Sequence, residues 1–492
     1  MGKILNSKLI LLWQKLSKEE QRALKRFLQS PFFTLRQDVY RLYEALRRVS
    51  IWKKQVDNRA VNEQRLQMKS FTKATLFTGT YPDEAYDDLR LRACMNDLQE
   101  LIERFLLIRS QEQNPVSRQL ELARLYQERQ LDKHFKFAHR KLQNRLDLAP
   151  WKDADHYQQR LDGQVQYLLY ESKKRRTGEL QLQQVSDSID QVFLIRKLRY
   201  ACTQLSHQAV YSTNYDFGLL PHIIDQIPSS SYYSTPAVAI YFHCYKFLSE
   251  TQGDEHYRVF SQLFFKEANR FSANERKGLY QLALNFCIRH HNKGDSEYTR
   301  EAWRLYRFAL DQGLLLEQQQ FSRFAFNNIV GIAIKLEELN WAEQFIKQYS
   351  GFIAEEFRTS TIALNSARLA FARKAFPAVL PFLQEVQRQD LLNNLIARVL
   401  LIKVFYETEA LTALEAQLDS LEQLLRRKDV SPFHQRNFGS FIRLLRRRID
   451  LAPYDEEERQ LLLRAINQSP ELSEKDWLIE IVSRAERKNT IN

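Results

Sequence analysis

Glycine and proline are scarce in this chain of 492 residues, with 12 of each. Together they make about 5% of the chain, against ~12% in average usage. A fold with many tight turns needs more of both, because they supply positive φ angles and fixed turn geometry. The shortage argues against a turn-rich β fold and favours long helices with short connections. The 31 Phe and 22 Tyr residues provide bulky side chains for packing between such helices.

Cysteine and long apolar runs are also scarce. The four cysteines lie far apart with no CxxC pair, which argues against a disulfide framework and fits a reducing compartment. The longest apolar runs, such as 399–402, are far shorter than the ~20 residues that span a bilayer. We therefore expect a cytoplasmic protein without membrane contact.

Motifs that carry catalysis or bind cofactors are missing. The sequence contains no GxxxxGK[ST], GxGxxG, HExxH or GxSxG pattern, so we expect no catalytic residue, no cofactor and no enzyme activity. One cluster resembles a zinc ligand set: Cys287, His290 and His291, with His243-Cys244 about one repeat earlier. Free cysteine usually behaves as a small buried apolar residue. We therefore predict that Cys244 and Cys287 are buried and bind no metal.

The net charge of +13 is unevenly distributed. Residues 1–207 hold 38 Lys and Arg against 25 Asp and Glu, whereas residues 208–492 hold 35 of each kind. Such an asymmetry can indicate an acidic partner, either nucleic acid or protein. Acidic residues are interleaved with the basic ones, however, which is typical of a solvated helix face.

The first 112 residues are predicted to form a helical domain. Ser17 and Glu20 have the capping-box spacing, so a helix should begin near Lys18. Further helices are expected at about 36–49 and from the Tyr81-Pro82-Asp83 turn to about Ser110. Asn114-Pro115 is predicted to separate this domain from the rest. Helices should then cover about 116–129, 132–148, 152–174 and 179–208.

Residues 113–236 are predicted to form helical hairpins that become irregular at 209–236, where three prolines lie near a serine run. One short helix is expected there, at about 216–227. From 237 to about 480 the chain repeats a helix-turn-helix unit, with turns predicted at Gly253-Asp254, Gly294-Asp295 and Leu339-Asn340. The second helices should cover His256–Phe271, Tyr298–Asp311 and Trp341–Tyr349. Alanines lie early in successive second helices, with spacings of 40, 36 and 35 residues: Ala302, Ala342, Ala378 and Ala413.

The repeated unit resembles a tetratricopeptide repeat. In residues 341–349, Trp-Ala-Glu-Gln-Phe-Ile-Lys-Gln-Tyr, a small residue stands early in the second helix and large apolar residues follow. The resemblance covers about residues 237–425 and lacks the Trp-Leu-Gly signature of the first helix and the closing proline. It implies an α-solenoid, or a related array of two-helix repeats.

A second resemblance involves the first 150 residues. Leu-Ser-Lys-Glu-Glu at 16–20, Phe-Leu-Gln-Ser-Pro-Phe-Phe at 27–33, Tyr-Asp-Asp-Leu-Arg at 86–90 and Met-Asn-Asp-Leu at 95–98 resemble an uncharacterised family of helical proteins from the Bacteroidota. Thr34 stands where that family usually has Asn. The resemblance implies a helical protein of similar length and no assigned activity.

Two basic runs are candidate contacts for an anionic partner. Cations that compensate a helix C-terminus would explain the first run, and pairing with nearby acids would explain the second; phosphate binding is the alternative for both. The residues concerned are Lys173, Lys174, Arg175, Arg176, Arg443, Arg446 and Arg447.

Taken together, these patterns predict an all-α protein: an N-terminal helical domain followed by an α-solenoid of helix-turn-helix repeats resembling tetratricopeptide repeats. The predicted function is a non-enzymatic scaffold that binds a protein or peptide on its concave surface, because stacked hairpins form an extended groove. The alternative is a nucleic-acid-associated protein that uses the basic region 1–207.

Overall fold

The protein is all-α, as predicted. The computed structural model describes residues 6–56, 72–174, 180–209, 211, 213–250, 253–292, 294–317, 319–386, 391–427, 430–452, 454–469 and 472–484. Two compact units are present: Met1–Ala149 with His156–Ser188, and Pro150–Asp155 with Ile189–Asn492. Within the described ranges, no helix is both long and apolar enough to cross a membrane.

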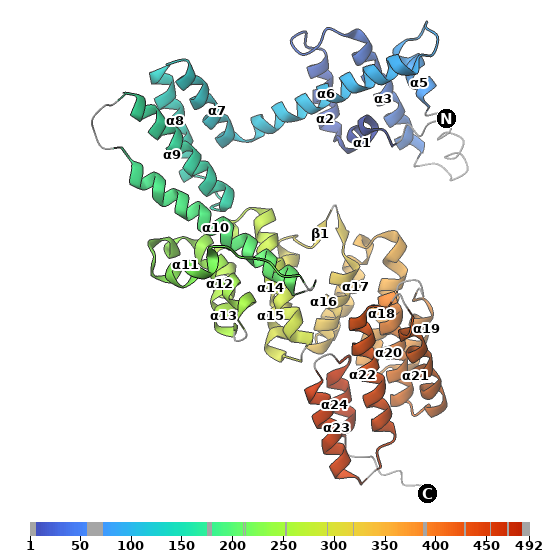
Figure 1. Ribbon diagram of the computed structural model, residues 1–492. Coiled ribbons are helices and arrows are strands. Elements are labelled where there is room, and N and C mark those ends of the chain that lie inside the picture. The colour runs from blue at the N-terminus through green and yellow to red at the C-terminus, as the bar shows by residue number, and fades with distance from the viewer. Residues whose placement is uncertain are drawn as a thin grey trace. The chain divides into compact units, whose positions relative to one another are not determined.

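Helices of the first unit form an N-terminal bundle followed by three neighbouring helices (Figure 1). The bundle contains α1 (Lys8–Lys15), α2 (Lys18–Leu28), α3 (Gln37–Val56), α5 (Lys73–Thr80) and α6 (Asp88–Gln113). It is followed by α7 (Pro115–Glu128), α8 (Asp132–Asp147), α9 (Ala154–Lys174) and the start of α10 (Leu182–Gln208). The four helices predicted over 116–208 are therefore present with shifts of a few residues at their ends.

Capping explains where several of these helices begin. Ser17 Oγ accepts from the Glu20 amide at 3.1 Å and Glu20 Oε2 accepts from the Ser17 amide at 2.7 Å, so the predicted capping box is confirmed. The helix predicted to follow Pro82 begins later, at Asp88, because Asp87 is its N-cap. Helix α5 was not predicted from the sequence. Asn114 caps α7 and Pro115 occupies its first turn, so the break in the helices at this point is confirmed.

The N-terminal bundle has an apolar core of its own. Fully buried side chains from α1, α2, α3, α5 and α6 meet there, among them Leu24, Leu42 and Leu98. The indole of Trp13 meets the edge of Tyr43 at 5.5 Å, and the Tyr43 hydroxyl donates to the Gln21 carbonyl. The compact unit nevertheless extends beyond this bundle to Ser188. The three-part division at 1–112, 113–236 and 237–480 stays a prediction.

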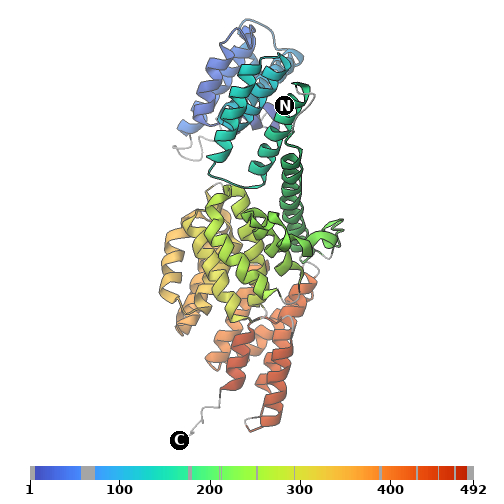
Figure 2. The ribbon, with the colours of Figure 1, turned by 90° about the vertical axis from the view of Figure 1, so that its left-hand side faces the viewer.

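The second unit consists largely of paired helices (Figure 2). It opens with irregular structure around α11 (Leu220–Ile223) and two 3₁₀ segments, Ile224–Ser229 and Ser231–Ser234. Five pairs follow: α12 (Pro236–Ser249) with α13 (Asp254–Glu267), α14 (Ala273–Asn292) with α15 (Ser296–Asp311), α16 (Arg323–Lys335) with α17 (Leu339–Tyr349), α18 (Glu355–Ala372) with α19 (Phe376–Gln384), and α20 (Leu391–Glu407) with α21 (Leu411–Leu425). The unit also contains the 3₁₀ segments Ala268–Arg270 and Ser350–Phe352, strands β1 (Leu316–Glu317) and β2 (Gln320–Phe321), and helices α22 (Pro432–Ile449), α23 (Glu456–Gln468) and α24 (Lys475–Ser483).

Within each pair we call the earlier member the first helix and the later one the second helix. First helices pack on one another, α12 on α14 and α18 on both α16 and α20. Second helices bridge consecutive pairs, since α15 packs on α16, α17 on α18 and α19 on α20. Successive pairs therefore bury their apolar stripes against the next pair.

One detail of the predicted repeat is wrong. The turn predicted at Leu339-Asn340 lies at 337–338, because Glu337 adopts a positive φ and Leu339 already begins α17. The four alanines lie early in the second helices α15, α17, α19 and α21, as predicted. Ala302 and Ala342 are buried, whereas Ala378 is exposed and Ala413 is half-buried, with the adjacent Val379 and Leu414 buried. The buried position thus shifts by one residue after the third pair.

The turns inside four of the five pairs share one hydrogen-bonding pattern. In α18–α19 the Lys374 amide donates to the Phe371 carbonyl and the Ala375 amide to the Ala370 carbonyl, both at 2.9 Å. These two bonds form a Schellman motif, which requires a left-handed residue after the helix. Lys374 adopts it with φ 58°, and the other turns with this pattern use Gln130, Gly294, Glu337 and Glu409. The turn that follows α15 has the same pattern at Gly313. Only two of these six left-handed residues are glycine, so the scarcity of glycine does not prevent tight turns.

We predict that Lys374→Gly stabilises the second unit. A side chain in the left-handed region costs ~1–2 kcal/mol and glycine costs ~0.5–1 kcal/mol in lost chain entropy, so the free energy of unfolding should rise by about 0.5–1 kcal/mol. Urea unfolding of the full chain measures the change. Ala372→Gly is the matched control. Ala372 lies two residues before Lys374, inside α18, and its replacement by glycine should destabilise the unit by ~1 kcal/mol. Equal losses for both variants would contradict the left-handed assignment.

Candidate functional site

In the predicted basic run at the end of α9, one lysine is paired with a carboxylate and one is exposed. Lys174 forms an ion pair with Asp132, and its ammonium lies 4.5 Å from the centre of the Tyr170 ring. Lys173 is exposed to solvent. Arg175 and Arg176 lie outside the described residues. Lys174 therefore links the end of α9 to the start of α8 through an ion pair.

The second predicted cluster lies on α22, in the other unit. Arg446 donates to Asp419 at 2.6 Å and also lies 3.3 Å from Glu422, while Arg447 donates to Glu458 at 2.6 Å. Arg443 is exposed. Two of these three cations thus neutralise nearby carboxylates, in line with the pairing considered for this run.

The cysteines and histidines weighed as zinc ligands are dispersed. Cys244 and Cys287 are both fully buried, as predicted, and the Cys287 thiol donates to the Tyr257 hydroxyl at 3.0 Å. Burial raises the pKa of Cys287 to about 12, so this thiol stays protonated at neutral pH. His243 instead contacts His256, with 2.9 Å between their Nδ1 atoms. Across the described ranges, no three His, Cys, Asp or Glu side chains are placed to hold a metal ion.

A polar row crosses three successive first helices in the second unit. Asn365 of α18 donates to Asn327 of α16 at 2.6 Å, and Asn327 donates to Asn393 of α20 at 3.1 Å. All three asparagines are buried. A buried amide costs free energy unless it is hydrogen-bonded. The three amides therefore fix the lateral register of α16, α18 and α20.

Each of the same three helices also contributes a basic side chain. Arg368 of α18 donates to the Asn327 carbonyl at 2.9 Å, beneath Gly331 of α16. A Cβ at Gly331 would collide with the Arg368 guanidinium, so glycine is required for this approach. Lys335 ends α16, and Lys403 is buried in α20. We call Lys335, Arg368 and Lys403 the basic row.

The chain's own C-terminal segment meets the basic row. Glu474 accepts from Lys403 at 2.6 Å, and Asp476 lies 2.8 Å from Lys335. Burial alone would raise the pKa of Glu474, but attraction to Lys403 and Arg368 outweighs it and lowers that pKa. Glu474 also adopts a left-handed backbone with φ 55°, which costs of order 1 kcal/mol and persists only when the surroundings enforce it.

Apolar contacts hold α24 beside this acidic segment. Trp477 packs against Tyr406 at 5.3 Å and donates to Glu407 at 2.9 Å, both on α20. Leu478 and Ile481 are buried in the apolar core shared with α20, α21 and α22. Helix α24 is thus docked on the array by an apolar face and by three ion pairs, because Arg484 at its end also lies 2.7 Å from Glu407 of α20.

The sequence patterns do not single out the basic row. Its members are 33 and 35 residues apart, so only the repeat brings them together. One signal was available: Lys403 lies in a strongly apolar stretch of α20, where a buried charge needs a partner.

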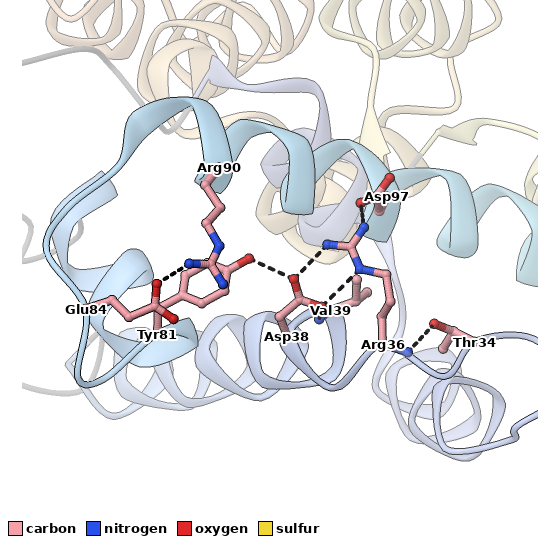
Figure 3. Close-up of polar contacts among 8 residues, drawn as sticks. All are labelled: Thr34, Arg36, Asp38, Val39, Tyr81, Glu84, Arg90 and Asp97. Atoms are coloured by element: carbon pink, nitrogen blue, oxygen red, sulfur yellow. Dashed lines mark hydrogen bonds and ion pairs between the residues drawn. The ribbon is translucent and has the colours of Figure 1, made fainter.

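A second polar cluster ties the N-terminal bundle together (Figure 3). Arg36 donates to both carboxylate oxygens of Asp38 at 3.1 and 2.7 Å and also pairs with Asp97 of α6. The Tyr81 hydroxyl donates to Asp38 at 2.8 Å, and the Arg90 guanidinium lies 4.1 Å from the Tyr81 ring centre. Arg90 and Asp97 thus help to join α3, α6 and the turn between α5 and α6.

The Asp38 carboxylate is the centre of this cluster and gives a pH-dependent prediction. Donation from Arg36, opposed by burial and helped by Tyr81, lowers the pKa of Asp38 to about 2. A lowered pKa means stabilisation that is complete above about pH 4 and lost as the pH falls towards 2. Asp38→Asn should therefore lower the local free energy of opening by roughly 1–2 kcal/mol at pH 7, with a smaller loss at pH 3.

Amide hydrogen exchange in α6 measures this effect. Asp83→Asn, an exposed residue in the same turn region as Tyr81, is the control and should leave exchange unchanged. A loss of stability in Asp38→Asn that is the same at pH 7 and pH 3 would show that the carboxylate charge is not the source.

The basic row and the docked C-terminal segment therefore constitute the candidate site. The resemblances to tetratricopeptide repeats and to a Bacteroidota family stay predictions. Comparison of the chain with protein-family models, with curated proteins and with solved structures gives no match to any of them.

Proposed function

We propose that this protein is a non-enzymatic helical-repeat scaffold, an α-solenoid of tetratricopeptide-like hairpins that binds a protein or peptide partner on its concave surface. The observation that carries the proposal is the basic row. Each of three consecutive first helices contributes one cation, and the row already holds an acidic polypeptide segment, Glu474 with Asp476.

The partner chemistry follows from this arrangement. Cations on successive repeats match carboxylates along an extended or helical segment. The neighbouring aromatic surface of α20 accepts a large apolar side chain, as it accepts Trp477. The proposed ligand is therefore an acidic segment followed by an apolar helical turn, and the chain's own residues 472–484 are its intramolecular equivalent.

The experiment frees the basic row in the full chain. Glu474→Gln with Asp476→Asn removes both carboxylate charges while keeping the side-chain shapes. We expect amide exchange in α24 to accelerate about tenfold or more, which corresponds to ~1.4 kcal/mol. A labelled peptide of residues 472–484 should then bind in trans, more weakly as salt rises.

Glu480→Gln is the matched control. Glu480 is on α24 but pairs with Arg484 rather than with the basic row, so this variant should behave as the unaltered chain does. Adding Lys335→Ala and Lys403→Ala to the freed variant should abolish peptide binding. If α24 loosens but no peptide binds, the segment is only a structural cap and the proposed function is wrong.

Nucleic-acid binding through the basic region 1–207 is the second proposal. The charge asymmetry favours it, but several of those cations already face carboxylates, as in the pairs of Lys25 with Glu44 and Arg36 with Asp97. We expect the full chain to bind duplex or single-stranded DNA only weakly at ~150 mM salt, where each phosphate contact is screened. A submicromolar dissociation constant in that buffer would reverse the order of the two proposals.

A further inference from the structure

Helix α10, the long green helix of Figure 1, is apolar on two opposite sides. From residue 189 onward it belongs to the second unit, and its inward side is buried there, as at Ile195, Leu198 and Cys202. The outward side nevertheless carries Phe193 and Tyr200, which are 39% and 66% exposed. A helix that is apolar on all sides usually lies between other elements. The outward side of α10 is therefore a candidate interface.

Exposed residues form a regular stripe along this outward side. Four and three residues alternate as the spacing between its members, and all five members are exposed: Ile189, Phe193, Arg196, Tyr200 and Thr203. This is the heptad spacing, which keeps side chains on one seam when two helices pack side by side. Single exposed apolar residues are normal on a protein surface, whereas a contiguous stripe indicates an interaction site. The occupant that fits this stripe is a helix.

Antiparallel pairing of α10 with α10 of a second copy matches the stripe to itself. In one register, Ile189 faces Tyr200 of the second copy and Phe193 faces Arg196 of the second copy. Each contact occurs twice, because a twofold axis relates the two copies. An apolar side chain then packs on each tyrosine ring, and an arginine lies against each phenylalanine ring, which is a favourable arrangement.

Charges that flank the stripe are complementary in the same register. Asp190 and Lys197 each follow a member of the stripe by one residue, and the pairing places Asp190 beside Lys197 of the second copy, again twice. Asp190 is exposed and accepts from the Tyr232 hydroxyl at 3.1 Å, but a carboxylate has room for further donors. Lys197 is half-buried near Gly218, and its long flexible stem allows the ammonium to reach outward.

Other arrangements of two α10 helices bring like charges together. A shift by one heptad places Lys197 beside Lys197 of the second copy or, in the other direction, Asp190 beside Asp190. Parallel pairing places Arg196 against Arg196 within the seam. Asp155 lies 3.7 Å from Arg196, but both side chains are exposed, so this pair offsets little of the repulsion. Juxtaposed like charges are costly, and the register with Ile189 opposite Tyr200 avoids them.

We propose that this protein forms a homodimer in which the stripe of α10 pairs antiparallel with the same stripe of a second copy. This interface is separate from the basic row, and it does not depend on the proposed function. A single pair of helices buries less surface than a standard interface of ~1,600 Å². The dimer therefore dissociates in the micromolar range.

Sedimentation velocity of the full chain, from ~1 to ~200 µM at ~150 mM salt, tests the dimer. Phe193→Ser and Tyr200→Ser should each weaken dimerisation about tenfold, because each change removes two contacts from the twofold seam. Leu411→Ser is the matched control, since Leu411 is similarly exposed, at 61%, but lies on α21. This variant should dimerise as the unaltered chain does.

Charge reversal tests the antiparallel register. Asp190→Lys and Lys197→Asp should each weaken the dimer about tenfold, because each change brings like charges together twice. The double variant re-forms both ion pairs with their signs exchanged, so it should dimerise nearly as well as the unaltered chain. Circular dichroism of each variant verifies that the helical fold is retained.

A chain that stays monomeric up to ~200 µM would overturn the proposal. A dimer that survives both Phe193→Ser and Tyr200→Ser would overturn it as well, because α10 would then not form the interface. Equal weakening by Leu411→Ser would show unspecific apolar association instead. A double charge variant as weak as the single variants would contradict the antiparallel register. Binding of a helix from another protein to a monomeric chain would replace the second copy with that partner.

Discussion

The Schellman turn that reverses the chain between paired helices is the constraint on which most of this structure depends. Two backbone hydrogen bonds and one left-handed residue place the second helix antiparallel to the first, so neither helix has to bury its apolar stripe alone. The same turn recurs at Glu337, Lys374 and Glu409, at intervals of 37 and 35 residues. Because the reversal repeats, equivalent positions of successive first helices come side by side. The asparagine row and the basic row both result from this register.

Charge has different consequences in the two units. All of the net charge of +13 arises from residues 1–207, yet many of those cations form ion pairs with neighbouring elements, as Lys174 does with Asp132 and Arg36 does with Asp97. Each of these exposed ion pairs contributes little to the free energy of folding. The pairing nevertheless reduces the positive charge that the surface presents to a binding partner. In the second unit, acids and bases balance, and the basic row is matched by Glu474 and Asp476.

Local sequence patterns predicted the positions of the helices well but predicted the contacts between helices poorly. The capping box at Ser17, the helix break at Asn114 and the buried cysteines follow from local chemistry, so single residues were sufficient evidence. The turn expected at Leu339-Asn340 lies earlier because Glu337, a residue without turn preference, adopts the left-handed conformation. Val379 and Leu414 are buried beside Ala378 and Ala413, which the spacing of the alanines did not predict, because helix contacts depend on volume at a position, whichever residue supplies it.

By itself, the sequence determined the fold class, most helix boundaries and the uneven charge, since these depend on spacing, capping and composition within one segment. Tertiary structure alone decided which side chains meet. Lys335 contacts Asp476 across 141 positions of the chain, and Asn365 donates to Asn327 across 38 positions. Helix packing depends on side-chain volume and on the geometry of the turns rather than on any motif. Those contacts therefore become visible only when the helices are placed in space.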